Sequence, residues 1–364
     1  MTEFDETIQP EFISDITNDF IDIKKTIEGY NYNMFQTTII KDDIEYYCER
    51  INIKSERDMN GTHGLFFSNN NNNNNNDTRF EGKEIDTEDP RLFICNNKIY
   101  VIFNAISPFP YHKRSMVISE YDDFCPVFLY IDDIEEEREH VVEKNWSPCV
   151  VNNKLYLIYL LDPLIVLHYD FNTEGICSIV YKQKPEISIQ QINTSNICLR
   201  GSSCFIPFCS GMLGELYIGL CHSYLFKNNQ HYYFTYLCVI DVSIWKIVYV
   251  SKPISCKGPD TISKYKDTDI IINYEKYYYL DTYNGCTRDI EISVVYPTSL
   301  YQEKEQDVSE YNIILNLNKY SLKNKITIDL VDILQKIMIN ISNNPNSSWD
   351  DIVRNYSIAI IDNL

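Results

Sequence analysis

The chain has little of what marks several common protein classes. It has 11 glycines in 364 residues, and none of them forms a Gly-rich phosphate-binding loop. No stretch approaches the roughly 20 consecutive apolar residues that a bilayer span requires. The first residues, from Met1 to Asp5, lack the basic region and apolar run of a signal peptide. We therefore expect a cytoplasmic protein without a membrane span.

Cysteine is present but never grouped. The 12 cysteines are scattered singly, without a C-x-x-C pair or a Cys/His cluster, and zinc sites and disulfide frameworks need such groupings. The motifs G-x-S-x-G and H-E-x-x-H and the spacing of a Ca²⁺ loop are missing as well. The sequence therefore predicts reduced core thiols in a reducing compartment, with neither a metal nor a cofactor.

Positive charge is in the minority. The 52 acidic and 32 basic side chains give a formal charge of −20, so attraction to phosphate backbones or anionic lipid surfaces is weak. This balance argues against nucleic acid as a partner. Aromatic residues are abundant instead, with 29 tyrosines and 17 phenylalanines, and these residues favour strands over helices.

A short apolar run, a two-residue polar turn and a Tyr-centred strand recur along the chain. The copies contain Tyr46, Tyr100, Tyr156 and, more loosely, Tyr217, so the spacings are 54, 56 and 61 residues. The clearest turns are Asp42-Asp43, Asn96-Asn97 and Asn152-Asn153. Such pairs between apolar runs indicate hairpins, and repeats of this length are typical of propeller blades. We therefore predict an all-β protein with a five-bladed β-propeller over residues 31–327.

Three segments depart from this pattern. Residues 1–30 form an acidic N-terminal segment, and residues 69–76 form a low-complexity Asn run that we expect to be a disordered loop insertion. Apolar residues at helical spacing follow Asp329, and Ser348 has the character of a helix N-cap. The sequence therefore predicts a C-terminal helical extension over residues 328–364, which we expect to cover a propeller edge.

The first residues of the repeats share one register. Asp89 lies eight residues before Asn97, and Asn145 lies eight residues before Asn153. The start of each blade's inner strand faces the central axis, so side chains at this register should converge. Acidic, basic, amide and aromatic groups occur there, in the stretches Glu88 to Arg91, Glu143 to Trp146 and Leu199 to Ser202.

Four motifs, in this order, resemble a known family. They are E-D-P-R-L-F (Glu88 to Phe93), E-K-N-W-S-P (Glu143 to Pro148), Leu199-Arg200-Gly201 and Tyr217-x-Gly219-x-x-His222. Together they look like the five-bladed propellers related to the mannoside phosphorylases, which include phosphorylases, hydrolases and mannosyltransferases. The resemblance covers about residues 35–330 and looks closest to propellers of giant DNA viruses and lower eukaryotes. For a viral protein, the expected compartment is the host cytoplasm.

The resemblance implies a role for each matching residue. Asp89, the candidate catalytic residue, would hold sugar hydroxyls together with Glu88. The remaining candidates would bind substrate, with the cationic ones facing a phosphate or leaving group; they are Arg50, Arg91, Lys144, Asn145, Trp146, Arg200 and His222. The implied reaction is glycosyl transfer or phosphorolysis on a mannoside-like sugar, and the implied partners are a sugar phosphate or nucleotide sugar and a glycan acceptor.

The chain also departs from the family pattern. Relatives are expected to carry an acid in the second-blade motif, K-D, where this chain has Lys144-Asn145, and an amide cannot donate a proton as a carboxylic acid does. Relatives often have S-Y-G and then an Asp in the last blade, where this chain has residues 315–317 with the sequence L-N-L. The alternative is therefore a catalytically inactive glycan-binding or structural propeller with a decayed pocket.

Several candidates also have a purely structural interpretation. Asp89-Pro90 could open a turn, with Arg91 paired to Glu88 or to a neighbouring acid. Trp146 could be a packed core aromatic instead of a platform for a sugar face. His222 could be a surface or core histidine. The sequence leaves these alternatives open.

Overall fold

The computed structural model describes the repeat region and short parts of the flanking segments. The described residues are 11–12, 19–20, 30–53, 62–70, 79–107, 114–132, 144–183, 199–211, 214–227, 230–251, 254–255, 270–273, 276–281, 288–291, 295–302, 310–317, 320–327 and 335. Nearly all of the predicted N-terminal segment, Asn-rich loop and helical extension lie outside this set, so these three predictions stay untested.

The described chain is mostly β-strand and follows a propeller arrangement. The first sheet has the order β3 (Tyr30–Lys41), β4 (Ile44–Ile53), β5 (Thr62–Asn69), β6 (Arg79–Glu81). A 3-10 helix, η1 (Lys83–Ile85), leads to the second sheet, which contains β7 (Glu88–Cys95), β8 (Lys98–Ile106), β9 (Arg114–Glu120) and β10 (Val127–Phe128). The third sheet contains β12 (Ser147–Val151), β13 (Lys154–Leu161), β14 (Leu164–Tyr169) and β15 (Ile176–Lys182), with β11 (Tyr130–Ile131) parallel to β15.

The second half of the chain adds three more sheets. One contains β17 (Ile206–Gly211), β18 (Gly214–Lys227), β19 (Gln230–Asp241) and β20 (Lys246–Val250), extended by β16 (Leu199–Gly201), β21 (Ile254–Ser255) and β1 (Glu11–Phe12). A small sheet contains β22 (Ile270–Asn273), β23 (Lys276–Asp281) and β24 (Arg288–Glu291). The last contains β25 (Val295–Tyr301), β26 (Glu310–Leu317), β27 (Tyr320–Thr327) and, from the N-terminal segment, β2 (Asp19–Phe20).

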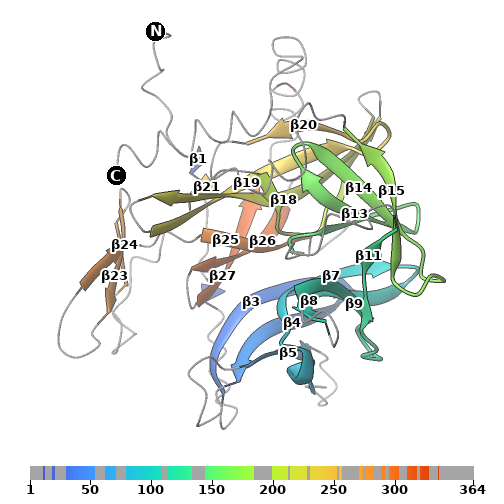
Figure 1. Ribbon diagram of the computed structural model, residues 1–364. Helices are drawn as coiled ribbons and strands as arrows, with labels where there is room; N and C mark the ends of the chain where they lie inside the picture. Colours follow the sequence, from blue (N-terminus) through green and yellow to red (C-terminus); the bar gives the residue numbers. More distant parts are fainter. Residues whose placement is uncertain are drawn as a thin grey trace.

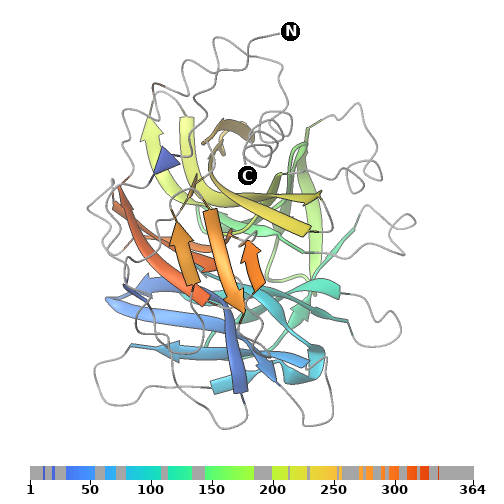
Figure 2. The same ribbon diagram turned by 90° about the vertical axis from the view of Figure 1, so that its left-hand side faces the viewer.

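Four of these sheets are antiparallel meanders of four consecutive strands, which is the pattern of a propeller blade. They are β3–β6, β7–β10, β12–β15 and β17–β20. Figure 1 shows them in sequence, from the blue β3–β5 through β7–β9 and β13–β15 to the yellow β18–β20, with β25–β27 lying between the first and the last. Figure 2 shows the same placement from the side. The predicted total of five blades stays a prediction.

The predicted polar turns are confirmed as tight hairpins. Both turn residues have positive φ in each case, with 52° and 60° at Asp42-Asp43, 49° and 60° at Asn96-Asn97, and 51° and 59° at Asn152-Asn153. Two consecutive left-handed residues form the type I′ turn, whose twist matches that of paired strands. Asn and Asp tolerate this conformation well, which explains how the chain forms its hairpins with few glycines.

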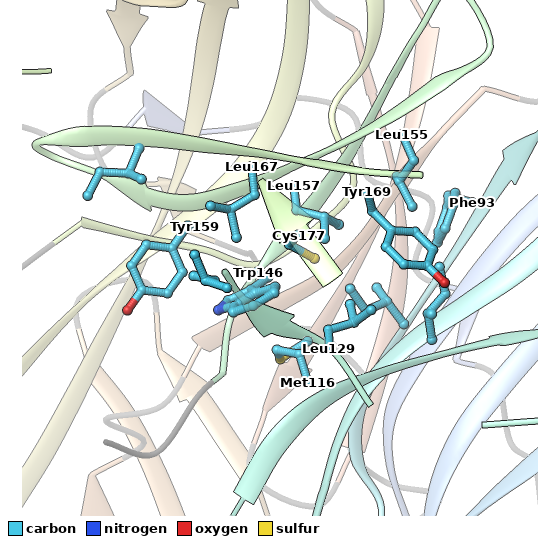
Figure 3. Packing of buried hydrophobic residues seen from close by; sticks show 14 of the residues in the cluster. Phe93, Met116, Leu129, Trp146, Leu155, Leu157, Tyr159, Leu167, Tyr169 and Cys177 are labelled. Atoms are coloured by element: carbon cyan, nitrogen blue, oxygen red, sulfur yellow. The ribbon is translucent and has the colours of Figure 1, made fainter. Parts of the chain in front are cut away.

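Apolar side chains fill the spaces between neighbouring sheets. One buried cluster joins β7–β10 to the third sheet and is centred on Trp146, with Met116, Leu129, Leu157 and Cys177 around it (Figure 3). A second cluster lies between the third sheet and β16–β20. Another cluster lies between β4–β5 and β7–β9. The described cysteines are all free, and six of them are buried as predicted: Cys48, Cys95, Cys149, Cys177, Cys221 and Cys238. No helix in the described part of the chain is long and apolar enough to span a membrane.

Candidate functional site

The candidate site begins where the inner strands begin. Asp89 and Asn145, which the sequence places in one register, both adopt left-handed backbone, with φ of 52° and 68°. Phe35, which lies eight residues before Asp43, has φ of 58°. The ladders of β3 and β7 skip a residue at Phe35 and Asp89, and such bulges redirect the side chains beside them. The shared register is therefore a shared backbone irregularity.

The carboxylate of Asp89 accepts a hydrogen bond on each oxygen. Arg50 of β4 donates from Nη1 to Oδ1 at 3.3 Å, and Asn104 of β8 donates from Nδ2 to Oδ2 at 3.4 Å. The Asp89 side chain remains 13% exposed. The carboxylate is therefore held in place from two strands while part of it stays accessible to a ligand.

Glu88 joins the same network on its outer side. Its Oε1 lies 3.0 Å from Arg50 Nη2, and its Oε2 lies 3.3 Å from Arg114 Nη1. Arg114 also donates to the Asn104 side-chain oxygen at 2.8 Å and to Asp86 Oδ2 at 2.6 Å. Two arginines thus bridge three carboxylates around the start of β7. Sequence reasoning found Arg50, Glu88 and Asp89 but missed the rest, because no motif marks residues that meet only through strand pairing.

Asp86 is fixed where η1 ends. Its backbone has φ of 47°, and its Oδ1 accepts from the backbone N–H of His63 at 2.7 Å. Partial burial alone would raise the pKa of Asp86, but the hydrogen bonds from the His63 backbone and side chain and from Arg114 outweigh it, so the pKa is lowered from its ordinary 3.8. Asp86 is therefore ionised at neutral pH.

Arg91 is a buried cation that connects three sheets. It is 2% exposed, and its Nε donates to the backbone carbonyl of Ser202. Its Nη1 donates to the Asp89 carbonyl at 3.1 Å, and its Nη2 donates to Asn145 Oδ1 at 3.4 Å. Among the described residues, no carboxylate lies within ion-pair distance of Arg91. The structural alternative, in which Arg91 pairs with Glu88 or a neighbouring acid, is therefore not what forms.

A second group of polar and aromatic side chains adjoins Asn145. The Tyr296 hydroxyl donates to Asn145 Oδ1 at 2.8 Å, and its ring lies 4.5 Å from the His222 ring. His222 Nδ1 lies 2.6 Å from Ser202 Oγ. Burial, followed by the charges of Arg200 and Arg91, holds the pKa of His222 well below its usual range. The imidazole is therefore neutral, and it contributes hydrogen bonding but no positive charge.

The remaining predicted site residues take different positions. Trp146 is 1% exposed and lies in the core cluster, with its ring edge-on to Tyr159 at 5.4 Å (Figure 3). The structure therefore favours the core alternative for Trp146, because the space between the second and third sheets encloses it. Lys144 is exposed, and Arg200 is half-buried on β16, opposite His222 in the β16–β18 ladder.

One group of side chains has the composition of a metal site. Donor atoms of His63, Asp86 and Glu88 lie within 4.8 Å of one another. The same groups already contact the guanidinium cations of Arg50 and Arg114. This arrangement instead indicates a network of ion pairs.

Solved structures share the fold of this chain at low sequence identity. A candidate glycosidase from Bacteroides thetaiotaomicron is 10% identical, with a TM-score of 0.52, covering 81% of this chain and 87% of that one. A β-1,2-mannobiose phosphorylase from Listeria innocua is 12% identical, with a TM-score of 0.49 and coverage of 88% and 97%. A GDP-Man-dependent mannosyltransferase, MPT-1, from Leishmania mexicana is 10% identical, with a TM-score of 0.48 and coverage of 83% and 87%.

Sequence comparison adds no relatives. No protein-family model matches the chain, and no curated protein is significantly similar to it in sequence. The structural likeness shows the fold alone: the chain is a β-propeller with the same fold as the Bacteroides thetaiotaomicron protein.

Proposed function

We propose that the protein transfers or phosphorolyses a mannoside-like sugar at the cluster around Asp89, Arg91 and Asn145. The observation that carries this proposal is the hydrogen-bonded convergence of these three residues from two sheets, with Tyr296 of β25 as a further partner of Asn145. The cluster combines an accessible carboxylate with a buried cation. Sugar hydroxyls and phosphate oxygens need such acceptors and donors, respectively.

Asp89 would bind sugar hydroxyls. A carboxylate that accepts from Arg50 and Asn104 is fixed as an acceptor, and its remaining lone pairs can take hydroxyl protons from a ligand. Asp89 therefore acts in this proposal as the residue that orients the sugar.

Arg91 and Arg200 would stabilise a phosphate group. A buried guanidinium whose partners are carbonyl and amide oxygens retains its full charge, and charge aimed at a developing anion lowers a transition-state barrier. Asn145 cannot protonate a glycosidic oxygen, which disfavours both hydrolysis and phosphorolysis by the usual acid. Transfer from a sugar phosphate or nucleotide sugar to a glycan acceptor requires less acid assistance and is the activity we favour.

The second candidate is a glycan-binding or structural propeller without catalysis. Asn145 favours it, because its Oδ1 accepts from both Arg91 and Tyr296 and so completes an internal network. Under this alternative, Arg91 holds the sheets together and the cluster binds sugar without turning it over.

We also propose that the propeller has five blades. We place the sheet β25–β27, with β2 as its outer strand, as the fifth blade. Contacts of β25 with both β18 and β3 support this placement, because they connect the last sheet to the first. A cytoplasmic location and kinship with viral propellers complete the proposal.

The test is a donor and acceptor screen. The purified protein is incubated with mannose 1-phosphate and with a panel of nucleotide sugars, each with oligosaccharide acceptors, and released phosphate, nucleotide and extended glycan are measured. We expect turnover by the wild type and a fall of about 100-fold or more in Asp89→Asn. The exposed Asp123→Asn variant is the matched control and should keep full activity. Binding of mannosides without turnover would support a glycan-binding propeller. The absence of both binding and turnover would refute the sugar-transfer proposal and leave the structural propeller.

A further inference from the structure

We propose that His63 is a positioning residue, which holds Arg50 in the orientation that fixes Asp89. This inference rests on the proposed function in so far as Asp89 binds substrate. None of the sequence motifs includes His63, which lies on β5 and is a diagonal neighbour of Arg50 across the β4–β5 pair. Its role follows from which atoms can donate and which can accept.

The contact with Arg50 decides where the His63 proton lies. Arg50 Nη2 lies 3.0 Å from His63 Nε2, and a guanidinium nitrogen can only donate. His63 Nε2 must therefore carry a lone pair, so the ring proton sits on Nδ1. That nitrogen lies 2.9 Å from Asp86 Oδ1, which can accept it. His63 is thus the neutral Nδ1–H tautomer, which accepts from Arg50 and donates to Asp86.

Asp86 is itself immobilised. Its Oδ1 accepts from the backbone N–H of His63 and its Oδ2 from Arg114. The charged groups that face His63 are therefore Asp86, Arg50 and Glu88, whose Oε1 lies 3.5 Å from Nδ1. An acceptor fixed in this way selects the tautomer and the ring orientation of a histidine.

Two chains of hydrogen bonds, here called arms, connect Asp86 to the two carboxylate oxygens of Asp89. In one arm His63 accepts a hydrogen bond from Nη2 of Arg50, and Nη1 of the same guanidinium then donates to Asp89 Oδ1. In the other arm Arg114 donates to Asn104 Oδ1, which turns the amide so that Nδ2 donates to Asp89 Oδ2. Asp86 anchors both arms, because it binds His63 and Arg114 at once.

A matched pair of substitutions separates this role from a merely structural one. In His63→Gln the amide oxygen replaces Nε2 as the acceptor for Arg50. In His63→Asn the amide nitrogen replaces Nδ1 as the donor to Asp86, but no acceptor reaches Arg50. We expect His63→Gln to keep the Arg50–Asp89 contact in a crystal structure and His63→Asn to lose it, with similar thermal unfolding of the two variants.

Two further readouts complete the test. The ¹⁵N shifts of the wild-type His63 ring at pH 7.5, assigned by their loss in His63→Asn, should report a protonated Nδ1 and an unprotonated Nε2. Binding of mannose 1-phosphate should weaken about tenfold in His63→Asn and much less in His63→Gln, because one hydrogen bond to a charged group is lost.

Each outcome has a defined meaning. An Nε2–H tautomer, an imidazolium ring, or an unchanged Arg50–Asp89 contact in His63→Asn would overturn the role of His63. Wild-type protein that neither binds nor turns over any sugar tested would overturn the proposed function alone, because the tautomer and the placement of Arg50 are measured without a ligand.

Discussion

Replacing Asn145 by aspartate tests the electrostatic character of the site with a change of one atom. Asn145 Oδ1 already accepts from Arg91 at 3.4 Å and from Tyr296 at 2.8 Å. Among the described residues, none accepts a hydrogen bond from Asn145 Nδ2, so the new oxygen breaks no bond there. The substitution therefore adds a negative charge beside a buried cation and leaves the shape unchanged.

The expected gain follows from two opposing terms. Unit charges 3.4 Å apart attract with about 5 kcal/mol at an effective dielectric constant of about 20. Burying the new carboxylate costs several kcal/mol, whereas the desolvation of Arg91 is common to both proteins. We expect Asn145→Asp to raise the free energy of unfolding at pH 7 by about 1–3 kcal/mol.

The sign of the pH dependence follows from the same contacts. Arg91 and the Tyr296 hydroxyl favour the charged form, so the new aspartate has a lowered pKa in the folded protein. Its contribution is complete above the unfolded value of about 3.9 and is lost as the pH falls through the folded value. The stability gain should therefore be present at pH 7 and disappear in acid.

The assay is urea unfolding followed by circular dichroism at several pH values. Asn153→Asp makes the same change in the β12–β13 turn, where the side chain is exposed, and serves as the control. An Asn145→Asp protein that is about 1 kcal/mol or more less stable than this control at pH 7 would show that desolvation outweighs the attraction. The unpaired charge that we assign to Arg91 would then be refuted.

Three further predictions concern single side chains. Trp146→Ala should lower the free energy of unfolding by about 3–5 kcal/mol in urea titrations, because the ring is buried between two sheets. A loss below about 1 kcal/mol together with weaker sugar binding would instead favour a role of Trp146 as a platform for a sugar face. Tyr296→Phe should lower the free energy of unfolding by about 1 kcal/mol, since the ring stays while the hydrogen bonds of the hydroxyl with Asn145 and Ser202 are lost. Asp86→Asn should be less stable than wild type at pH 7, and calorimetry should find this difference vanishing as the pH falls below 3.8; a difference that persists in acid would contradict the lowered pKa.

Local chemistry made the hairpins and the shared register predictable. The Asp and Asn pairs at residues 42–43, 96–97 and 152–153 adopt the left-handed turn for reasons contained in two residues. The distance from turn to strand start is fixed by the chain, so Asp89 and Asn145 could be aligned from the sequence alone. The number of blades and the terminal helices were inferred from spacing and pattern and stay predictions.

Partners far apart in the chain could not be predicted in this way. Asn145 and Tyr296 are separated by 151 residues, and Arg91 and Ser202 by 111. The sequence also left Trp146 open between core and site, and the packing of the second sheet against the third placed it in the core.

Backbone preferences act over a few residues, so the turns, the alternating strands and the residues at the start of each inner strand follow from local sequence. The support of Glu88 and Asp89 by His63, Asp86 and Arg114, and the binding of Arg91 to carbonyl and amide oxygens instead of a carboxylate, follow only from the folded chain. Side-chain partners depend on strand pairing and on how whole sheets dock, and the summed packing of the entire core sets both.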